Sequence, residues 1–229
     1  MNKDEFQRRA FERMIEGKRM SFEEVFRLGL NALLDPFRFL NMFMPGPSGY
    51  ALRRVVYKNR FKSLGKNCIL DIGMKIVGSG NISVGEYTWI DSYTSINALF
   101  GPITIGKRVH ISPFTIIGAG KEGVEIQDYV GVASGCKIYG HSEIQKDGKR
   151  MSGPMIPWRY KAYHSGPVIL EKDSVLGTNS VVLPGVTIGE GAVVCPGSLI
   201  TKDIPPWVIA CGTPTRFIGK RDKVSVPDL

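Results

Sequence analysis

Aliphatic residues recur at every sixth position in the C-terminal half of the chain, and this period constrains the fold more than any other feature. Between residues 170 and 200 the run is unbroken: Leu170, Leu176, Val182, Ile188, Val194 and Ile200. A fixed period marks a repeat, in which each short unit buries its apolar side on its neighbours. A helical interpretation fails, because the segment lacks a 3.6-residue period and is rich in Gly and Val.

The same register extends toward the N-terminus in triplets, and each triplet predicts one three-sided coil. Further triplets begin at Leu64, Val84, Ile105 and Ile126, so we expect about six coils stacked as a triangular prism. Small or β-branched residues follow four positions later and should also face inward: Cys68, Thr88, Thr94, Thr115, Cys136, Ser174, Ser180, Ala192 and Ser198. Glycine follows the aliphatic residue where we expect tight corners that need permissive backbone angles: Gly85, Gly106, Gly118, Gly177 and Gly189.

The N-terminal region has a helical pattern, and we expect it to cover the open first coil. Its helical segments are residues 4–17, 21–35 and 50–65. The apolar run PFRFLNMFMP at 36–45 is expected to pack on the solenoid, and the alternative is weak association with a membrane surface. The predicted organisation is a helical cap at 1–63, a repeat domain at 64–221 with a loop at 139–166, and a tail at 222–229.

Charge is concentrated ahead of the repeat. Of the formal net charge of +9, the first 66 residues contribute 14 − 7 = +7 from Lys and Arg against Asp and Glu. Acids are interleaved with the bases and no nucleic-acid motif is present, so we interpret this arm as a solvated helical face without a nucleic-acid partner. The four cysteines have no paired or metal-binding spacing, and no signal peptide or membrane-length apolar run is found. These features favour free thiols and a cytoplasmic protein.

The chain from about Leu64 to Arg221 resembles the hexapeptide-repeat acyltransferases. Besides the repeat, the ending LITKDIPPWVIACGTPTRFIGKR at 199–221 is similar to the closing segment of galactoside, maltose and polysaccharide-sugar acetyltransferases. The resemblance implies an all-β fold, a left-handed parallel β-helix, and transfer of an acetyl group from acetyl-CoA. The left hand rests on the resemblance alone, because connections between parallel strands are normally right-handed. We further expect a homotrimer, in which one prism face of each helix packs around a threefold axis.

The longest interruption of the repeat is a loop of 27 residues between Ile138 and Gly166. Loops of this length are usually functional or disordered. Its aromatic and basic side chains suit stacking on a sugar ring and pairing with phosphate. We therefore assign acceptor binding to Tyr139, Trp158, Arg159, Tyr160 and His164. The alternative is a flap that only packs on a neighbouring subunit.

His141 is the candidate general base among the three histidines. It follows the last aliphatic residue of a coil, where the galactoside acetyltransferase pattern places a histidine, although the Pro that follows that histidine is missing here. Imidazole is basic near neutral pH, and a backbone carbonyl on its other nitrogen would fix its orientation. A backbone N–H of a coil corner would hold the oxyanion. His110 precedes the inward Ile111 and should point outward in a structural role.

The resemblance also implies a site for acetyl-CoA, in which pantetheine lies along a groove between two subunits. Thr178 and Pro196 match the two corner positions, although Pro196 has no N–H to donate. Thr201, Lys202 and Arg216 match the adenosine and phosphate end, where cations make charge-assisted contacts.

Acceptor and linkage stay open, because family members of this layout acetylate sugar hydroxyls or the amine of nucleotide-linked amino sugars. The resemblance is greatest to enzymes of surface-polysaccharide and nucleotide-sugar pathways. A non-catalytic scaffold would leave the polar-aromatic loop unexplained. A carbonic anhydrase on this fold needs three converging histidines, and ours are 31 and 23 residues apart, so no metal is expected. A nucleotidyltransferase needs a glycine-rich phosphate-binding domain, which is absent.

Overall fold

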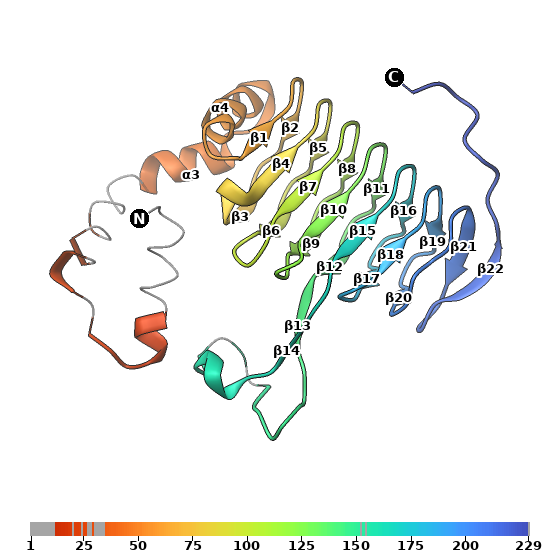
Figure 1. The fold of residues 1–229 in the computed structure, drawn as a ribbon. Coiled ribbons are helices and arrows are strands. Elements are labelled where there is room, and N and C mark those ends of the chain that lie inside the picture. The colour runs from red at the N-terminus through yellow and green to blue at the C-terminus, as the bar shows by residue number, and fades with distance from the viewer. Residues whose placement is uncertain are drawn as a thin grey trace.

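A parallel β-helix dominates the computed structural model, which describes residues 12–19, 21–23, 25–26, 29, 35–151, 153 and 155–228 (Figure 1). Helices α3 (Asp35–Phe43) and α4 (Gly46–Lys58) come directly before it. The first sheet contains β1 (Ser63–Leu64), β4 (Ile82–Val84), β7 (Ile103–Ile105), β10 (Val124–Ile126), β15 (Val168–Leu170) and β18 (Thr187–Ile188).

Two further sheets complete the three-sided prism. The second contains β2 (Ile69–Leu70), β5 (Trp89–Ile90), β8 (His110–Ile111), β11 (Gly131–Val132), β16 (Val175–Leu176), β19 (Val193–Val194), β21 (Val208–Cys211) and β22 (Arg216–Lys220). The third contains β3 (Lys75–Val77), β6 (Ser95–Asn97), β9 (Ile116–Gly118), β12 (Lys137–Tyr139), β17 (Val181–Val182) and β20 (Leu199–Ile200). All pairs are parallel except the last, β21 with β22.

The sixfold register of the sequence is confirmed by the pairing of the strands. In the second sheet Leu70 pairs with Ile90, Ile90 with Ile111, and Ile111 with Val132. The aliphatic residues of successive coils therefore stack along the axis, and they form most of the buried core. The small residues predicted to face inward are all buried as well, because three strands leave little space at the axis.

The predicted reason for the corner glycines is wrong. The left-handed backbone angle falls two residues later, at Tyr87, Arg108, Asn179 and Gly191. The glycines are required instead because adjacent coils touch there: a Cβ on Gly85 would lie 2.5 Å from the carbonyl carbon of Gly106, and one on Gly177 would lie 2.5 Å from the nitrogen of Pro196. Gly118 differs from them, because a Cβ there would meet only ordinary contacts.

Helix α4 covers the first coil through a buried arginine. The Arg53 side chain is 1% exposed; its Nε donates to the carbonyl of Leu70 at 2.6 Å, and its Nη1 donates to the carbonyls of Met44 and Asn41. The predicted helix at 50–65 ends early, at Lys58, because the chain enters strand β1 at Ser63 and pairs there with β4. The predicted helices at 4–17 and 21–35 fall partly outside the described residues, and the proposed division into cap, repeat domain and tail stays a prediction.

The 139–166 loop contains an antiparallel hairpin that projects from the coils (Figure 1). Its strands are β13 (His141–Glu143) and β14 (Tyr163–Ser165), and a short 3-10 turn, η2 (Trp158–Tyr160), lies near its tip. A second such turn, η1 (Ser79–Asn81), lies between β3 and β4. No helix in the described part of the chain has the length and apolarity needed to cross a membrane.

Candidate active site

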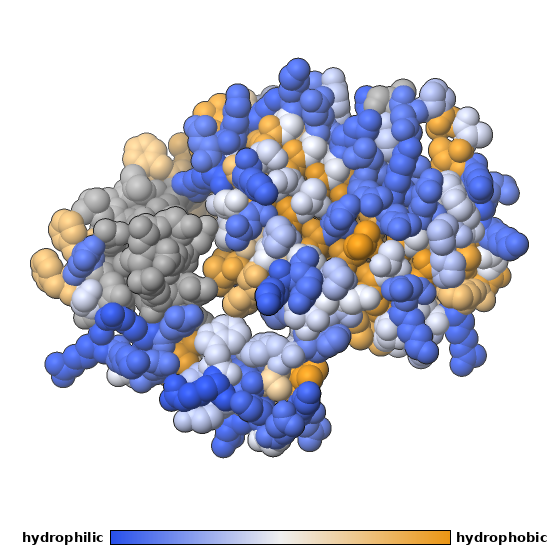
Figure 2. Space-filling view, in the orientation of Figure 1, coloured by the Kyte–Doolittle hydropathy of each residue, from blue (hydrophilic) through white to orange (hydrophobic). Residues whose placement is uncertain are grey.

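A cleft of about 770 Å³ lies between the hairpin and the outer face of the third sheet. Its floor is built by residues that alternate with the buried aliphatic positions and therefore point outward. Asn97, Gly118 and Tyr139 form one row across β6, β9 and β12, because the register pairs Asn97 with Gly118 and Gly118 with Tyr139. Figure 2 shows the hollow between the coils and the hairpin. The repeat thus builds a flat, rigid floor beneath a projecting hairpin.

His141 lies at the base of the hairpin and lines this cleft. The ring of Phe100 contacts it edge-on, with centroids 5.2 Å apart and an interplanar angle of 72°. Its Nδ1 is buried and has no hydrogen-bond partner among the described residues, so the backbone carbonyl expected to orient the ring is not found there. Packing against Phe100 places the ring instead.

Gly118 provides the space in front of His141. A Cβ at residue 118 would lie 3.9 Å from Cδ1 of Tyr139 and 4.0 Å from Cε1 of His141. A larger side chain at this position would therefore extend into the cleft beside the imidazole. Neither the backbone angle nor a neighbouring coil requires a glycine at this position. The effect of Gly118 on the structure is therefore to keep the cleft accessible.

An aromatic wall continues from His141 into the hairpin. Phe100 contacts Trp158 edge-on at 5.3 Å, and Trp158 lies 5.2 Å from Tyr163, measured between ring centroids. Trp158 and Tyr163 both line the cleft. Burial raises the pKa of the Tyr163 hydroxyl, so this group stays protonated at neutral pH and can donate a hydrogen bond.

An ion pair between a buried lysine and a partly exposed glutamate holds this wall. The side chain of Lys161 is 2% exposed, and its Nζ donates to Oε1 of Glu143 at 2.8 Å and to the carbonyl of Gly153. Nζ also lies 5.8 Å from the Trp158 ring and 6.0 Å from the Tyr163 ring. Burial favours a lower pKa for Lys161, but the hydrogen bonds and charge interactions with Glu143 and Tyr163 together outweigh it and the pKa is raised; the hydrogen bond to Lys161 lowers the pKa of Glu143. Both groups therefore stay charged near neutral pH.

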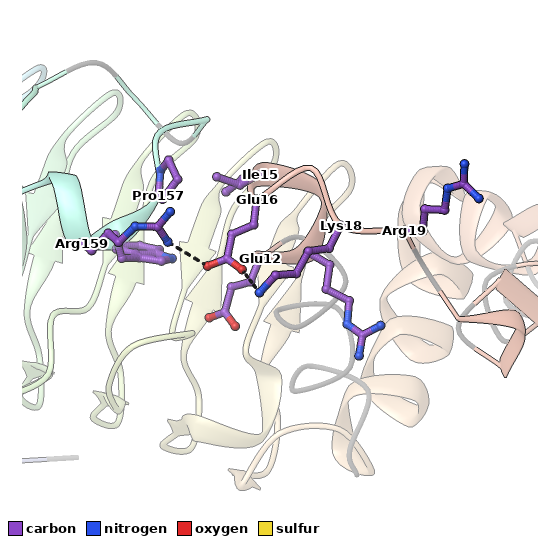
Figure 3. A pocket seen from close by; sticks show the side chains of 9 residues that line it. Glu12, Ile15, Glu16, Lys18, Arg19, Pro157 and Arg159 are labelled. Carbon is purple, nitrogen blue, oxygen red and sulfur yellow. Dashed lines mark hydrogen bonds and ion pairs between the residues drawn. The ribbon is translucent and has the colours of Figure 1, made fainter.

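The structure brings together only some of the predicted acceptor-binding residues. Tyr139 and Trp158 line the cleft beside His141. Arg159 turns away: its guanidinium lies over the Tyr160 ring at 4.7 Å and pairs with Glu16 at 3.3 Å, within a separate pocket of about 570 Å³ that Trp158 also lines (Figure 3). His164 pairs with Ser142 across the hairpin, is exposed, and is not among the residues that line the cleft.

The predicted CoA residues lie on exposed corners away from this cleft. Thr178 and Pro196 follow β16 and β19 on consecutive coils, and the carbonyl of Thr178 accepts a hydrogen bond from Gly197. Thr201 and Lys202 follow β20 at another corner, and Arg216 begins β22. All five side chains are exposed. Neither of these corners lines the cleft at His141, so a single chain does not join the two predicted sites.

His110 points outward, as predicted. It is exposed on β8, lies 3.4 Å from a carboxylate oxygen of Asp91 and packs on Trp89 with ring centroids 5.3 Å apart. The three histidines therefore do not converge. Within the described residues, no group of three or more His, Cys, Asp and Glu side chains lies close enough to hold a metal ion.

Sequence reasoning assigned no role in the site to several residues that line the cleft, among them Asn97, Phe100, Gly118, Glu143 and Tyr163. Asn97 and Gly118 directly follow the inward aliphatic residues Ile96 and Ile117, so their outward direction could be predicted from the alternation of a strand. The contact of Phe100 with the hairpin could not be predicted from the sequence, because nothing in the local pattern predicts where a long loop folds back.

Known proteins are similar to this chain over most of its length. The family described as bacterial transferase hexapeptide (six repeats) matches at residues 167–202. The dTDP-4-amino-4,6-dideoxy-D-glucose acyltransferase of Escherichia coli is 35% identical over 164 residues, which are 71% of this chain and 84% of that protein. The chain belongs to the hexapeptide-repeat acyltransferases.

Two other members of the acyltransferase family extend the comparison. The galactoside O-acetyltransferase of Escherichia coli K12 is 28% identical over 187 residues, covering 77% of this chain and 74% of that enzyme. AntD, an N-acyltransferase from Bacillus cereus, has a crystal structure with dTDP and 3-hydroxybutyryl-CoA; it superposes with a TM-score of 0.69 at 32% identity, covering 74% of this chain and 88% of that one. These comparisons confirm the predicted fold, in which coils of hexapeptide repeats stack on one another, and they confirm that the chain is an acyltransferase.

Proposed function

We propose that this acyltransferase moves an acetyl or related acyl group from its CoA thioester to the amine of a nucleotide-linked amino sugar. The observation that carries the proposal is the cleft at His141, where a histidine, a sugar-sized floor and an aromatic wall meet. The E. coli relative acts on a dTDP-linked amino sugar, and AntD binds dTDP with an acyl-CoA. O-acetylation, the activity of the galactoside enzyme, is the second candidate.

In this mechanism His141 takes the proton that the acceptor amine or hydroxyl loses as it attacks the thioester carbonyl. A C–N or C–O bond forms, the C–S bond breaks, and the thiol leaves with a proton. The uncharged imidazole suits this because its ordinary pKa lies near neutrality. Tyr163 and Asn97 line the same cleft, and their side chains are polar groups that can position the sugar.

The CoA thioester fits the exposed corners only if a second chain completes its site. Lys202 and Arg216 supply cations for phosphates, and Thr178 and Pro196 border a corner along which an extended chain can run. These residues do not reach His141 within one chain. We therefore propose a homotrimer, in which the corners of one subunit face the cleft of the next. Because CoA thioesters and nucleotide sugars are cytoplasmic metabolites, we place the reaction in the cytoplasm.

A thiol-release assay tests the proposed function. The purified protein is given acetyl-CoA with a panel of acceptors: a dTDP-linked 4-amino sugar, the same nucleotide sugar with a hydroxyl at that carbon, and a simple galactoside. We expect thiol release only with the amino sugar. Release with the hydroxyl acceptors alone would assign O-acetylation. If no acceptor gives thiol release and calorimetry detects no CoA binding, the result would favour the alternative that the protein is a non-catalytic scaffold.

A further inference from the structure

Helix α3 presents a cluster of large apolar side chains to solvent. Phe37 is 73% exposed, Phe39 66% and Leu40 50%, within a helix of nine residues. Single exposed apolar residues are common on protein surfaces, but a contiguous group of this size marks an interaction site. The packing of residues 36–45 on the solenoid, favoured from the sequence, does not explain these three side chains.

Arg53 fixes which side of the cap faces the coils. Its guanidinium donates a hydrogen bond to the carbonyl of Leu70 in the first coil. It also donates to the carbonyls of Asn41, near the end of α3, and of Met44, just after that helix. The main chain of residue 73 adds a second link, because Gly73 donates to the carbonyl of Met42. The C-terminal end of α3 is therefore held on the first coil, and the apolar cluster stays on the outside.

Basic residues lie on one side of the apolar cluster, at the end of α4. Between Asp35 and Asp71 the sequence contains seven Lys and Arg residues and no Asp or Glu. Lys58 and Arg60, at the end of α4, are exposed and form no ion pair with a described residue. Such a basic surface attracts anionic lipid headgroups, so each cation near the bilayer strengthens binding to an anionic membrane.

A hollow of about 310 Å³ joins the two features. Phe37 and Arg60 both line it, and so does Lys75 of β3, while Val56 and Met74 give it apolar walls. A cation beside an apolar hollow matches an anionic phospholipid, whose phosphate pairs with the cation while its acyl chain contacts the apolar wall. Figure 2 shows hydrophobic residues at the surface beside hydrophilic ones at this end of the molecule. Lys75 also lines the acceptor cleft, so the hollow and the cleft are neighbours.

We propose that α3 and its flanking cations dock the protein on an anionic lipid bilayer, with the apolar face of α3 lying in the headgroup region. The helix lies on the membrane and does not cross it. A symmetric contact with a second copy is disfavoured, because it would bring together two surfaces with the same excess of positive charge. Docking would hold the acceptor cleft close to the membrane, and it does not depend on which acyl group or acceptor the enzyme uses.

The test is flotation of the full chain with vesicles at physiological salt. Vesicles of phosphatidylcholine alone are compared with vesicles that also contain phosphatidylglycerol. The wild type should float only with the anionic vesicles. The double variants Phe37→Ser with Phe39→Ser, and Lys58→Glu with Arg60→Glu, should each lose at least ten-fold in vesicle affinity. The matched controls Phe217→Ser and Lys223→Glu, which change exposed residues at the other end of the chain, should float like the wild type.

Several results would overturn the docking proposal. One is a wild type that stays at the bottom of the gradient with anionic vesicles; another is equal flotation of the two double variants and the wild type. A smaller assembly in light scattering for the Phe37 and Phe39 variant, without a change in flotation, would assign the surface to a second copy instead. Thermal melting of each variant shows whether it is folded, and if the apolar variant unfolds, the Lys58 and Arg60 variant decides the question.

Discussion

His141 is placed by aromatic packing on Phe100 and by its position at the first residue of β13, not by a hydrogen bond within the described chain. A base held in this way still needs a polar partner when it becomes charged, since a buried ring nitrogen without one is costly. The proposed trimer brings a second chain to this side of the cleft. Because Nδ1 of His141 is already buried within one chain, a neighbouring subunit reaches it only if the residues that cover it move.

Replacing His141 tests its role as the general base. We expect His141→Ala to lower kcat by roughly 10²–10⁴-fold with little change in CoA affinity, because the imidazole that takes the proton is then missing. His110→Ala and His164→Ala are the controls and should have much smaller effects, since both side chains are exposed outside the cleft. A small effect of His141→Ala with a hydroxyl acceptor would contradict the assignment. A small effect with an amine alone would indicate that the amine arrives deprotonated.

Gly118 allows the cleft itself to be blocked without changing a reactive group. We expect Gly118→Leu to raise the acceptor KM by about ten-fold or more, because the added side chain enters the space beside Tyr139 and His141. Gly131→Leu is a matched control, since Gly131 also points outward from a strand and a Cβ there meets only Val175 at 3.8 Å. Steady-state kinetics measure the effect. Equal KM values for the two variants would show that the acceptor does not enter this cleft.

The hairpin of β13 and β14 is the element that turns a flat sheet face into a cleft. Its base is tied to the solenoid: Gly166 donates to the carbonyl of Gly140, and the Ser165 hydroxyl bonds to Glu122. Farther out, Lys161 and Glu143 hold the aromatic wall. Because the coils pair with one another through main-chain bonds on either side of it, the hairpin is an addition to the repeat and not a support for it.

Shortening the hairpin separates folding from acceptor use. Joining Ser142 to His164 by a two-residue turn keeps His141 but removes Lys161, Trp158 and Tyr163. We expect an unchanged melting temperature for the β-helix, retained CoA binding, and loss of acceptor saturation, because the wall that faces the sugar is gone. Calorimetry with CoA and kinetics with the acceptor measure the two properties separately. Normal acceptor saturation in the shortened protein would show that the hairpin takes no part in acceptor binding.

The coils were predictable from the sequence because each obeys a local rule, whereas the cleft was not. The spacing of Leu70, Ile90 and Ile111 alone predicts their stacking along the axis, and the small residues such as Thr94 follow from the limited space there. The hairpin folds back through contacts of Phe100 with Trp158 that join residues far apart in sequence. His141 was found by resemblance, but Arg159 and His164 were placed in the cleft only because they share its loop.

Trimer formation is a prediction about the whole molecule. The predicted CoA residues and His141 occupy separate parts of one chain, so an active unit needs a neighbour. Light scattering at micromolar concentration should give three times the mass of one chain. A mixed-subunit experiment adds a functional check: combining His141→Ala chains with chains altered at Thr178 and Lys202 should restore part of the activity. A fully active monomer would refute the assembly.

In the reaction that we propose, this protein joins an acyl group to the amine of a nucleotide-linked sugar. Its most direct test is the mass of the product formed from acetyl-CoA and dTDP-4-amino-4,6-dideoxyglucose. We predict a sugar nucleotide that has gained one acetyl group, whose amide bond withstands mild base. A recovered sugar nucleotide of unchanged mass, or an acetyl group that mild base removes as an ester, would contradict the account.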